Sequence, residues 1–236
     1  VLFRSEKPLS RRASEVERAF DAADAAGRLL MEAFMWRHNP QTTALRRLMD
    51  EGAIGELRLV RAAFSFLLGD PADVRLSPEL EGGGLMDVGC YCVSGARLLA
   101  GEPCVVSAQQ VTTDGGVDTR LAAVMRHDGD VLATIDCGLD LPAGRDSLEA
   151  VGSAGSLVLT DPWHCHASRI EIHRGGGVEV LATDPADSYR LELEQFGAAV
   201  RGEAEPLLGR ADAFGQARAI EALYASADAG GTAITL

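Results

Sequence analysis

A succession of strand-length segments fills residues 105–182 and constrains the fold more than any other feature of this sequence. In residues 131–137, buried-type apolar side chains alternate with side chains of mixed polarity, as a strand with two unequal faces requires. Asp128-Gly129 and Gly175-Gly176-Gly177 separate pairs of these segments and are typical of hairpin turns. These features predict a large, mostly antiparallel open sheet. Its expected strands are residues 57–68, 105–113, 119–127, 131–138, 146–151, 156–160, 169–174 and 178–182.

Helical segments accompany this sheet and are expected at residues 43–51, 85–99, 187–201 and 211–227. We place the last three near one face of the sheet, which makes residues 35–236 an α+β domain. The opposite face then has no cover within the domain, and a second copy of the chain is the usual cover for such a face. The sequence therefore predicts a homo-oligomer that pairs through the open face of the sheet.

The first residues predict a different arrangement, a strand–helix–strand unit with parallel strands. Residues 1–3 are typical of a buried strand, a helix is expected to run to about Ala26, and residues 29–35 form the second strand. The connection between the strands is expected to be right-handed. Two parallel strands do not complete a sheet, so we expect the natural protein to have further strands before residue 1.

Charge and cysteine content exclude several classes of protein. The formal net charge is −13, which disfavours binding to nucleic acids and to anionic membrane surfaces. No apolar run approaches the length of a membrane-spanning helix. The five cysteines lack the spacing of a disulfide framework, so a reducing, cytoplasmic location is expected, unless an upstream signal segment directs the protein elsewhere. These properties favour a protein that handles a small or neutral ligand.

Lys7 is the only lysine among 22 basic residues, which makes it a candidate functional residue. Arginine carries a fixed charge on a planar group, whereas a lysine ammonium is compact and has a tunable pKa. Because every other basic residue is arginine, this single lysine indicates a position where arginine cannot replace lysine. Lys7 also follows a predicted strand of an open α/β sheet, and such sheets bind ligands beyond the carboxyl ends of their strands.

A second candidate site lies at residues 82–91, where three glycines lead into a predicted helix. Asp87 and Tyr91 are four residues apart and share one helical face, and the glycines allow a ligand or another backbone to approach closely. A phenol beside a lysine ammonium has a lowered pKa and can exchange a proton with a hydroxyl or carbonyl oxygen. From spacing alone, a structural interpretation of both residues is favoured over a catalytic one. The helix dipole stabilises an aspartate early in a helix, and tyrosine is common at half-buried positions.

Several short segments together resemble the Gfo/Idh/MocA oxidoreductases, named for glucose–fructose oxidoreductase and inositol dehydrogenase. The order and spacing of these segments are specific to the family, and the resemblance covers the chain from Glu6 onward. Tyr91, four residues after Asp87, is similar to the tyrosine of glucose–fructose oxidoreductases, xylose dehydrogenases and dihydrodiol dehydrogenases. The segments are Glu6-Lys7-Pro8, residues 31–37, residues 82–91, Gly152-Ser153-Ala154-Gly155 and residues 222–227.

The resemblance implies a domain organisation and an activity. Residues 1–34 are expected to be an α/β remnant of a Rossmann domain that binds NAD or NADP, truncated at its N-terminal side. Residues 35–236 are expected to be the α+β domain that binds substrate and dimerises. The implied reaction transfers a hydride between the nicotinamide and a sugar or cyclic polyol. The phosphate-binding loop of the family lies upstream of residue 1, so the fragment alone is expected to be inactive.

The resemblance also implies roles for individual residues. Lys7 and Tyr91 are expected to be catalytic in proton transfer, and Asp87 is expected to orient them. The cofactor is expected at Glu6, Lys7, Trp36 and Arg37, and the substrate at Lys7, Arg37, His38, Asp87 and Tyr91.

Two other functions remain open from the sequence. One is an enzyme of the same family that uses its nicotinamide transiently to cleave a sugar bond, and the other is a non-catalytic, dimerising interaction module. The joint presence of Lys7, Asp87 and Tyr91 favours the dehydrogenase. No metal site is expected, because His164-Cys165-His166 has the spacing of a strand and lacks further ligands nearby in the sequence.

Overall fold

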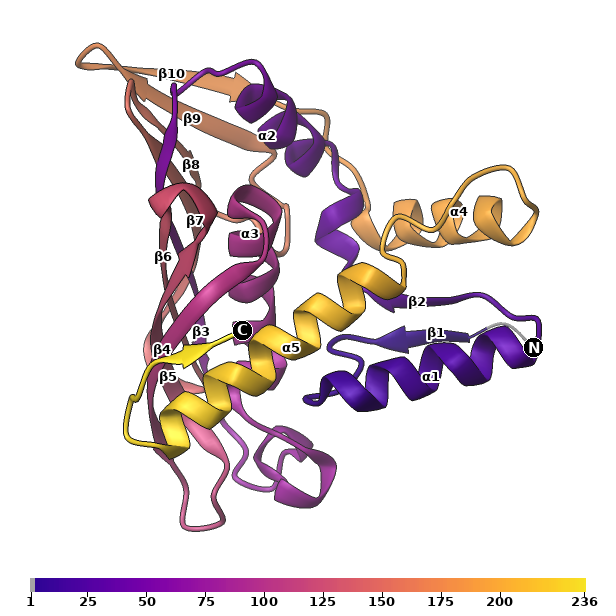
Figure 1. The fold of residues 1–236 in the computed structure, drawn as a ribbon. Helices are drawn as coiled ribbons and strands as arrows, with labels where there is room; N and C mark the ends of the chain where they lie inside the picture. The colour runs from indigo at the N-terminus through magenta and orange to yellow at the C-terminus, as the bar shows by residue number, and fades with distance from the viewer. Residues whose placement is uncertain (1–2) are drawn as a thin grey trace.

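The computed structural model describes residues 3–236, which form a nine-stranded sheet, a separate two-stranded sheet and five α-helices. The strand order of the large sheet is β10-β9-β8-β7-β3-β6-β5-β4-β11 (Figure 1). Its strands are β3 (Leu57–Leu67), β4 (Pro103–Thr112), β5 (Asp118–His127), β6 (Leu132–Gly138), β7 (Asp140–Gly152), β8 (Ser156–Leu159), β9 (Arg169–Arg174), β10 (Gly177–Ala182) and β11 (Ile234–Thr235).

The large sheet is mixed but mostly antiparallel, as predicted. Strand β3 pairs in parallel with β6, and every other neighbouring pair is antiparallel. The turn after β5 uses Gly129 at φ 69° and joins β5 to β6, and Gly175 and Gly176 turn β9 back onto β10 with φ of 60° and 79°. These left-handed conformations explain why glycine occupies the turns.

Helices cover one face of this sheet. Figure 1 shows α3 (Cys90–Ala100) and α5 (Arg210–Asp228) on the same side, and α2 (Pro40–Asp50) lies near the β9 end. The prediction that residues 187–201 also lie near this face was wrong. Helix α4 (Ser188–Val200) packs mainly on the 3-10 turn Met35–His38, and Phe196 and Ala199 are its buried apolar side chains.

The strand–helix–strand unit is present at the start of the described residues. It comprises β1 (Phe3–Glu6), α1 (Ala13–Ala25) and β2 (Leu30–Ala33), with β1 and β2 parallel. Val1 and Leu2, part of the predicted first strand, lie outside the described residues. Strand β1 continues through Glu6, beyond the predicted strand at residues 1–3, because Glu6 still pairs with Ala33. Helix α1 packs on α5 through Val16, Phe20 and Ala217.

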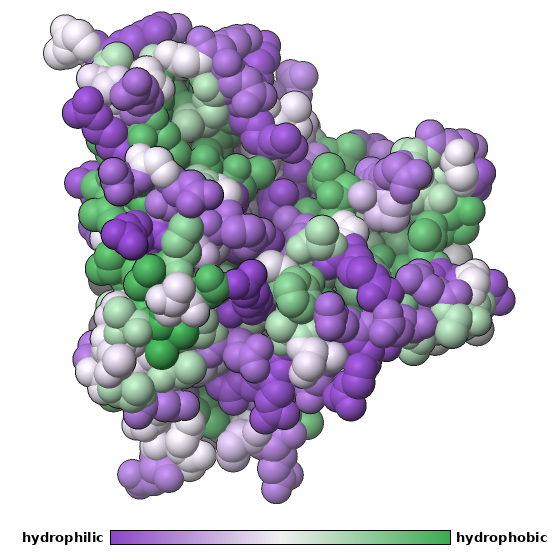
Figure 2. Space-filling model, in the orientation of Figure 1, coloured by the Kyte–Doolittle hydropathy of each residue, from purple (hydrophilic) through white to green (hydrophobic). Residues whose placement is uncertain are grey.

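The other face of the large sheet is not covered by the described part of the chain. Apolar side chains on it are exposed on several strands, as predicted, and charged side chains such as Arg61 and Arg126 lie among them. Figure 2 shows green hydrophobic residues interspersed with purple ones along this side of the molecule. The exposed apolar residues on these strands include Val111, Val124, Leu132, Val178 and Val180. None of the described helices has the length and apolar character needed to cross a membrane.

Candidate functional site

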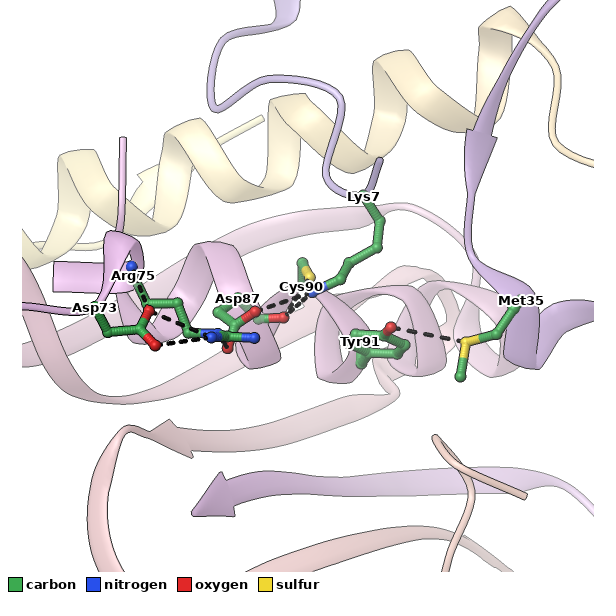
Figure 3. Close-up of polar contacts among 7 residues, drawn as sticks. All are labelled: Lys7, Met35, Asp73, Arg75, Asp87, Cys90 and Tyr91. Carbon is green, nitrogen blue, oxygen red and sulfur yellow. Dashed lines mark hydrogen bonds and ion pairs between the residues drawn. The ribbon is translucent and has the colours of Figure 1, made fainter. Parts of the chain in front are cut away.

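Lys7, Asp87 and Tyr91 come together in the structure although 84 positions separate the first from the last in the printed sequence (Figure 3). Lys7 extends from the end of β1, Asp87 lies in the π-helical turn η4 (Leu85–Gly89), and Tyr91 is in the first turn of α3. The Lys7 ammonium donates to the backbone carbonyl of Asp87 and lies 3.3 Å from its Oδ1. The same ammonium is 4.8 Å from the centroid of the Tyr91 ring.

Arg75 completes the charged part of this cluster. Its Nε lies 2.8 Å from Asp87 Oδ2, and its Nη1 lies 3.2 Å from Asp73 Oδ2. The Asp87 carboxylate therefore bridges two cations, Lys7 on one oxygen and Arg75 on the other (Figure 3). Arg75 was not predicted, because it lies in a turn-rich loop, in the 3-10 turn Val74–Leu76, where no motif or spacing links it to Lys7 or Asp87.

The sequence predicts a lowered pKa for Tyr91 beside Lys7, whereas the structure shifts this pKa in the opposite direction. Burial raises its pKa, and the Lys7 ammonium lies over the ring rather than beside the oxygen, so it does not offset this effect. The hydroxyl points toward Met35 Sδ at 3.7 Å, and the ring packs edge-on against Phe64. Tyr91 therefore carries its phenolic proton in the free protein and can donate it to an oxygen that enters the site.

The glycines before Asp87 allow an unusually close approach between segments. A Cβ at Gly83, which has φ 138°, would lie 2.0 Å from Asp118 Oδ1. The buried Asp118 carboxylate accepts hydrogen bonds from the Leu85 N–H at 2.7 Å and from the Tyr224 hydroxyl at 2.8 Å. Asp118 thus anchors the start of the π-helical turn that presents Asp87, and such turns are frequent at functional sites.

Two clefts meet at these residues. The first has a volume of about 510 Å³ and is lined by Lys7, Asp87 and Tyr91 together with aromatic side chains such as Phe64 and Tyr189. The second, of about 430 Å³, lies beside Glu6 and the glycine run and shares Lys7 and Asp87 with the first. Arg75 also lines both clefts, so a group bound in either cleft lies near the Lys7 and Arg75 cations.

The structure does not bring the segment Trp36–His38 into this cluster. Trp36 is fully buried and its ring packs edge-on against Trp163 at 5.1 Å. Arg37 is mostly buried beside Asp212, with Nη1 3.6 Å from Oδ1. His38 lines a separate cleft of about 650 Å³ between α2 and α4, where burial lowers its pKa to about 4. Their roles in binding cofactor or substrate stay predictions.

Comparisons with known proteins decide the family. Residues 42–158 match the GFO/IDH/MocA C-terminal domain. The chain is 38% identical over 231 residues to D-xylose 1-dehydrogenase (NADP(+)) 2 of Haloferax volcanii, in a match that covers 95% of this chain and 70% of the relative. This chain belongs to the Gfo/Idh/MocA family. Other relatives of this chain are named for the oxidation or reduction of different small molecules.

A relative named trans-1,2-dihydrobenzene-1,2-diol dehydrogenase, from Danio rerio, is 32% identical in a match that covers 69% of this chain and 49% of the relative. The crystal structure of aldose–aldose oxidoreductase from Caulobacter crescentus, complexed with glycerol, superposes with a TM-score of 0.92 at 25% identity. That match covers 100% of this chain and 72% of the other. The resemblance of the sequence to the family is therefore confirmed, and its members differ in the small molecules they are named for.

In this Gfo/Idh/MocA chain a buried carboxyl group supports the segment after Lys7. Glu32 Oε1, on β2, accepts a hydrogen bond from the Leu9 N–H at 2.8 Å. The Glu32 side chain is almost fully buried, which raises its pKa to about 8, and the charge of the neighbouring Asp212 acts in the same direction. Arg97 and Arg37 partly oppose this rise. Glu32 is therefore protonated at neutral pH and holds the backbone two residues beyond Lys7.

This buried carboxyl predicts a pH-dependent stability. The pKa of Glu32 is about 8 in the folded state and 4.5 in its ordinary state, so its contribution is present below pH 4.5 and is lost as pH rises toward 8. We expect the free energy of unfolding to fall by up to about 1.4 kcal/mol per pH unit across this window because of Glu32. Glu32→Gln keeps an acceptor for Leu9 and should remove this slope. Urea denaturation of both proteins at several pH values tests it, and parallel pH profiles would contradict it.

An imidazole held by two carboxylates also lines the first cleft. His164 Nδ1 lies 2.7 Å from Asp146 Oδ2 and 3.5 Å from Asp161 Oδ1, and ligand-type atoms of the three lie within 4.8 Å of one another. His166 is mostly exposed and its ring stacks on His164 at 5.6 Å. The sequence assigned no role to His164, because Asp146 comes from strand β7 and no spacing signal connects the two.

Proposed function

We propose that this chain contains the substrate site of an NADP-dependent sugar oxidoreductase. The observation that carries the proposal is the position of Lys7, Asp87 and Tyr91 at the junction of two clefts. The relatives support it, since the names of several refer to oxidation or reduction of sugars, and one name specifies NADP. A sugar or cyclic polyol would occupy the cleft that Tyr91 and Phe64 line.

The residues present fit the nicotinamide end of a dinucleotide. Glu6 ends a parallel strand and Lys7 follows it, where open α/β sheets bind ligands, and the cleft beside them shares Lys7 with the substrate cleft. NADP, when bound, accepts or supplies the hydride. We accordingly propose that residues 1–34 belong to a dinucleotide-binding domain and residues 35–236 to a substrate-binding domain.

Proton transfer is the part of the reaction that this chain performs. When an alcohol is oxidised to a carbonyl, a hydride leaves the carbon and a proton leaves the hydroxyl oxygen. In the reverse direction, reduction of a carbonyl, the Tyr91 phenol and the Lys7 ammonium each carry a proton that can pass to the oxygen as the hydride reaches the carbon. In oxidation, either group receives the proton of the hydroxyl only after it has released its own proton to solvent. Asp87 fixes the Lys7 ammonium over the Tyr91 ring, and Arg75 fixes Asp87.

A spectrophotometric assay tests the function. The full-length protein is incubated with NADP and a panel of aldoses and cyclic polyols, and formation of reduced nicotinamide is followed. We expect turnover of at least one aldose. Failure to oxidise any member of the panel, with no reduction of the corresponding lactones or ketoses, would contradict the proposal and favour a non-catalytic module.

We further propose that two copies pair through the uncovered face of the large sheet. Exposed apolar side chains on β5 and β6, with Val124 and Leu132 among them, supply the contact, and a stable pair would bury about 1,000 Å² or more. Leu132→Glu is expected to convert the dimer to a monomer in light scattering, because it places a charge in this contact. Leu80→Glu, at a more exposed leucine outside the sheet, should leave the dimer intact. A monomeric wild-type protein would contradict the proposal.

A further inference from the structure

His164 lies in the proposed substrate cleft but has no part in the proton transfer described above. The Phe64 ring separates it from the catalytic cluster, since this ring packs edge-on against Tyr91 at 5.4 Å and against His164 at 5.3 Å. The cleft is lined by all three side chains. A substrate that reacts beside Tyr91 and extends past Phe64 would reach the imidazole with a part of the molecule remote from the reacting carbon.

The segment that carries His164 is held firmly by its neighbours. Trp163 is fully buried and donates from Nε1 to the Ala63 carbonyl at 3.0 Å. Asp161 Oδ2 accepts from the backbone N–H of His166 at 2.6 Å and of Ala167 at 3.0 Å. Cys165 has φ 61°, a conformation that is costly for a residue other than glycine and persists where the surroundings enforce it. The imidazole is therefore presented to the cleft in a defined position.

The charges around His164 favour an imidazole that donates hydrogen bonds. The hydrogen bond from Nδ1 to Asp146 raises the pKa of His164, and the charge of Asp161 adds to this effect. Burial of the ring opposes this rise. His166 stacks on the ring, and the titratable side chains that line the same cleft include Arg145 and Tyr189. A protonated imidazole donates from both ring nitrogens, so Nε2 can donate to an oxygen in the cleft while Nδ1 remains bonded to Asp146.

We propose that His164, held by Asp146 and Asp161, determines specificity by donating a hydrogen bond to a substrate hydroxyl remote from the reacting carbon. The site then favours a polyhydroxylated sugar over a cyclic diol whose remaining surface is hydrocarbon. This inference rests on the proposed sugar oxidoreductase function. Its physical basis is that a hydrocarbon placed against His164 leaves the polar Nε2 of the imidazole without a partner, which a site built for hydrogen bonding penalises.

The experiment compares two substrates in the full-length protein with NADP. D-xylose presents hydroxyls around its ring, whereas trans-cyclohexane-1,2-diol presents hydrocarbon beyond its two adjacent hydroxyls. In His164→Leu we expect kcat/KM for xylose to fall by about ten- to a hundredfold, mainly through KM, because the hydrogen bond between the imidazole and the substrate hydroxyl is lost. We expect kcat/KM for the diol to stay constant or rise, so the ratio of the two values falls.

Two further variants separate specificity from folding. His164→Gln keeps a side-chain donor and should retain a ratio closer to that of the wild-type protein. His166→Leu alters the stacked, exposed neighbour and should leave the ratio unchanged. If His164→Leu lowers kcat/KM for both substrates equally, or leaves the ratio within twofold of wild type, the inference is wrong although the enzyme is active. If the wild-type protein turns over neither substrate nor any aldose, the proposed function fails and the inference fails with it.

Discussion

Lys7→Ala in the full-length protein is expected to lower kcat for aldose oxidation by roughly 10²–10⁴-fold, the usual contribution of a positioned proton-transfer group. The ammonium of Lys7 contacts Asp87 and the ring face of Tyr91, so its loss removes the cation at the point where the two clefts meet. The fold should survive, since Asp87 keeps its ion pair with Arg75. Steady-state kinetics and the melting temperature of the variant measure the two effects separately.

Lys7→Arg makes this prediction more specific. A guanidinium keeps the positive charge but is larger, planar and unable to release a proton, so we expect the activity of this variant to stay close to that of Lys7→Ala. Arg12→Ala, which removes an exposed cation from the segment after Lys7, is the matched control and should retain full activity. Activity of Lys7→Arg near the wild-type level would show that Lys7 acts only through its charge, which contradicts its assignment to proton transfer.

Tyr91→Phe is expected to lower kcat by roughly 10²–10⁴-fold with little change in stability. The hydroxyl has only a weak sulfur contact with Met35 in the free protein, and phenylalanine keeps the packing against Phe64. The variant therefore removes a proton donor and leaves the core unchanged. Kinetics with the best aldose of the panel, in both reaction directions, measure the effect.

Tyr224→Phe is the matched control for Tyr91. Its hydroxyl donates to the buried carboxylate of Asp118 at 2.8 Å, so its removal should cost about 1–3 kcal/mol of stability. Tyr224 lies outside the cleft that Tyr91 lines, and its effect on kcat should be small by comparison. If Tyr91→Phe instead resembles Tyr224→Phe, with lost stability and retained turnover, Tyr91 has a structural role only.

Sequence periodicity predicted most of the large sheet because its strands alternate buried and exposed side chains and end at glycine turns. Strand β7 was predicted too short, since Pro142 and Gly144 are typical of turns. In the structure Arg145 and Asp140 still pair with β3, on either side of an irregularity in register. Strand β11 is a two-residue pairing and has no periodicity to detect. The packing of α4 on Met35–His38 depends on tertiary contacts that no local pattern encodes.

The candidate site could be predicted only where a motif or an unusual residue indicated it. Lys7 was indicated by its rarity and its place after a strand. The roles of Asp87 and Tyr91 were predicted from the resemblance to the family, because their spacing alone favoured a structural interpretation. Arg75 and His164 could not be found in this way. Arg75 lies in an irregular loop, and the partners of His164 come from β7 and from a turn, so their proximity depends on the completed sheet.

Direct transfer of a labelled hydride tests the central claim, that the junction of clefts at Lys7, Asp87 and Tyr91 is the site of oxidoreductase chemistry. The full-length protein is incubated with NADP and D-xylose deuterated at C1, and the reduced cofactor is analysed by mass spectrometry. We predict that deuterium appears in the reduced cofactor with the wild-type protein. With Lys7→Ala and with Tyr91→Phe, the initial rate of deuterium transfer should fall by roughly 10²–10⁴-fold. Deuterium transfer at the wild-type rate in both variants would show that the reaction takes place without this cluster.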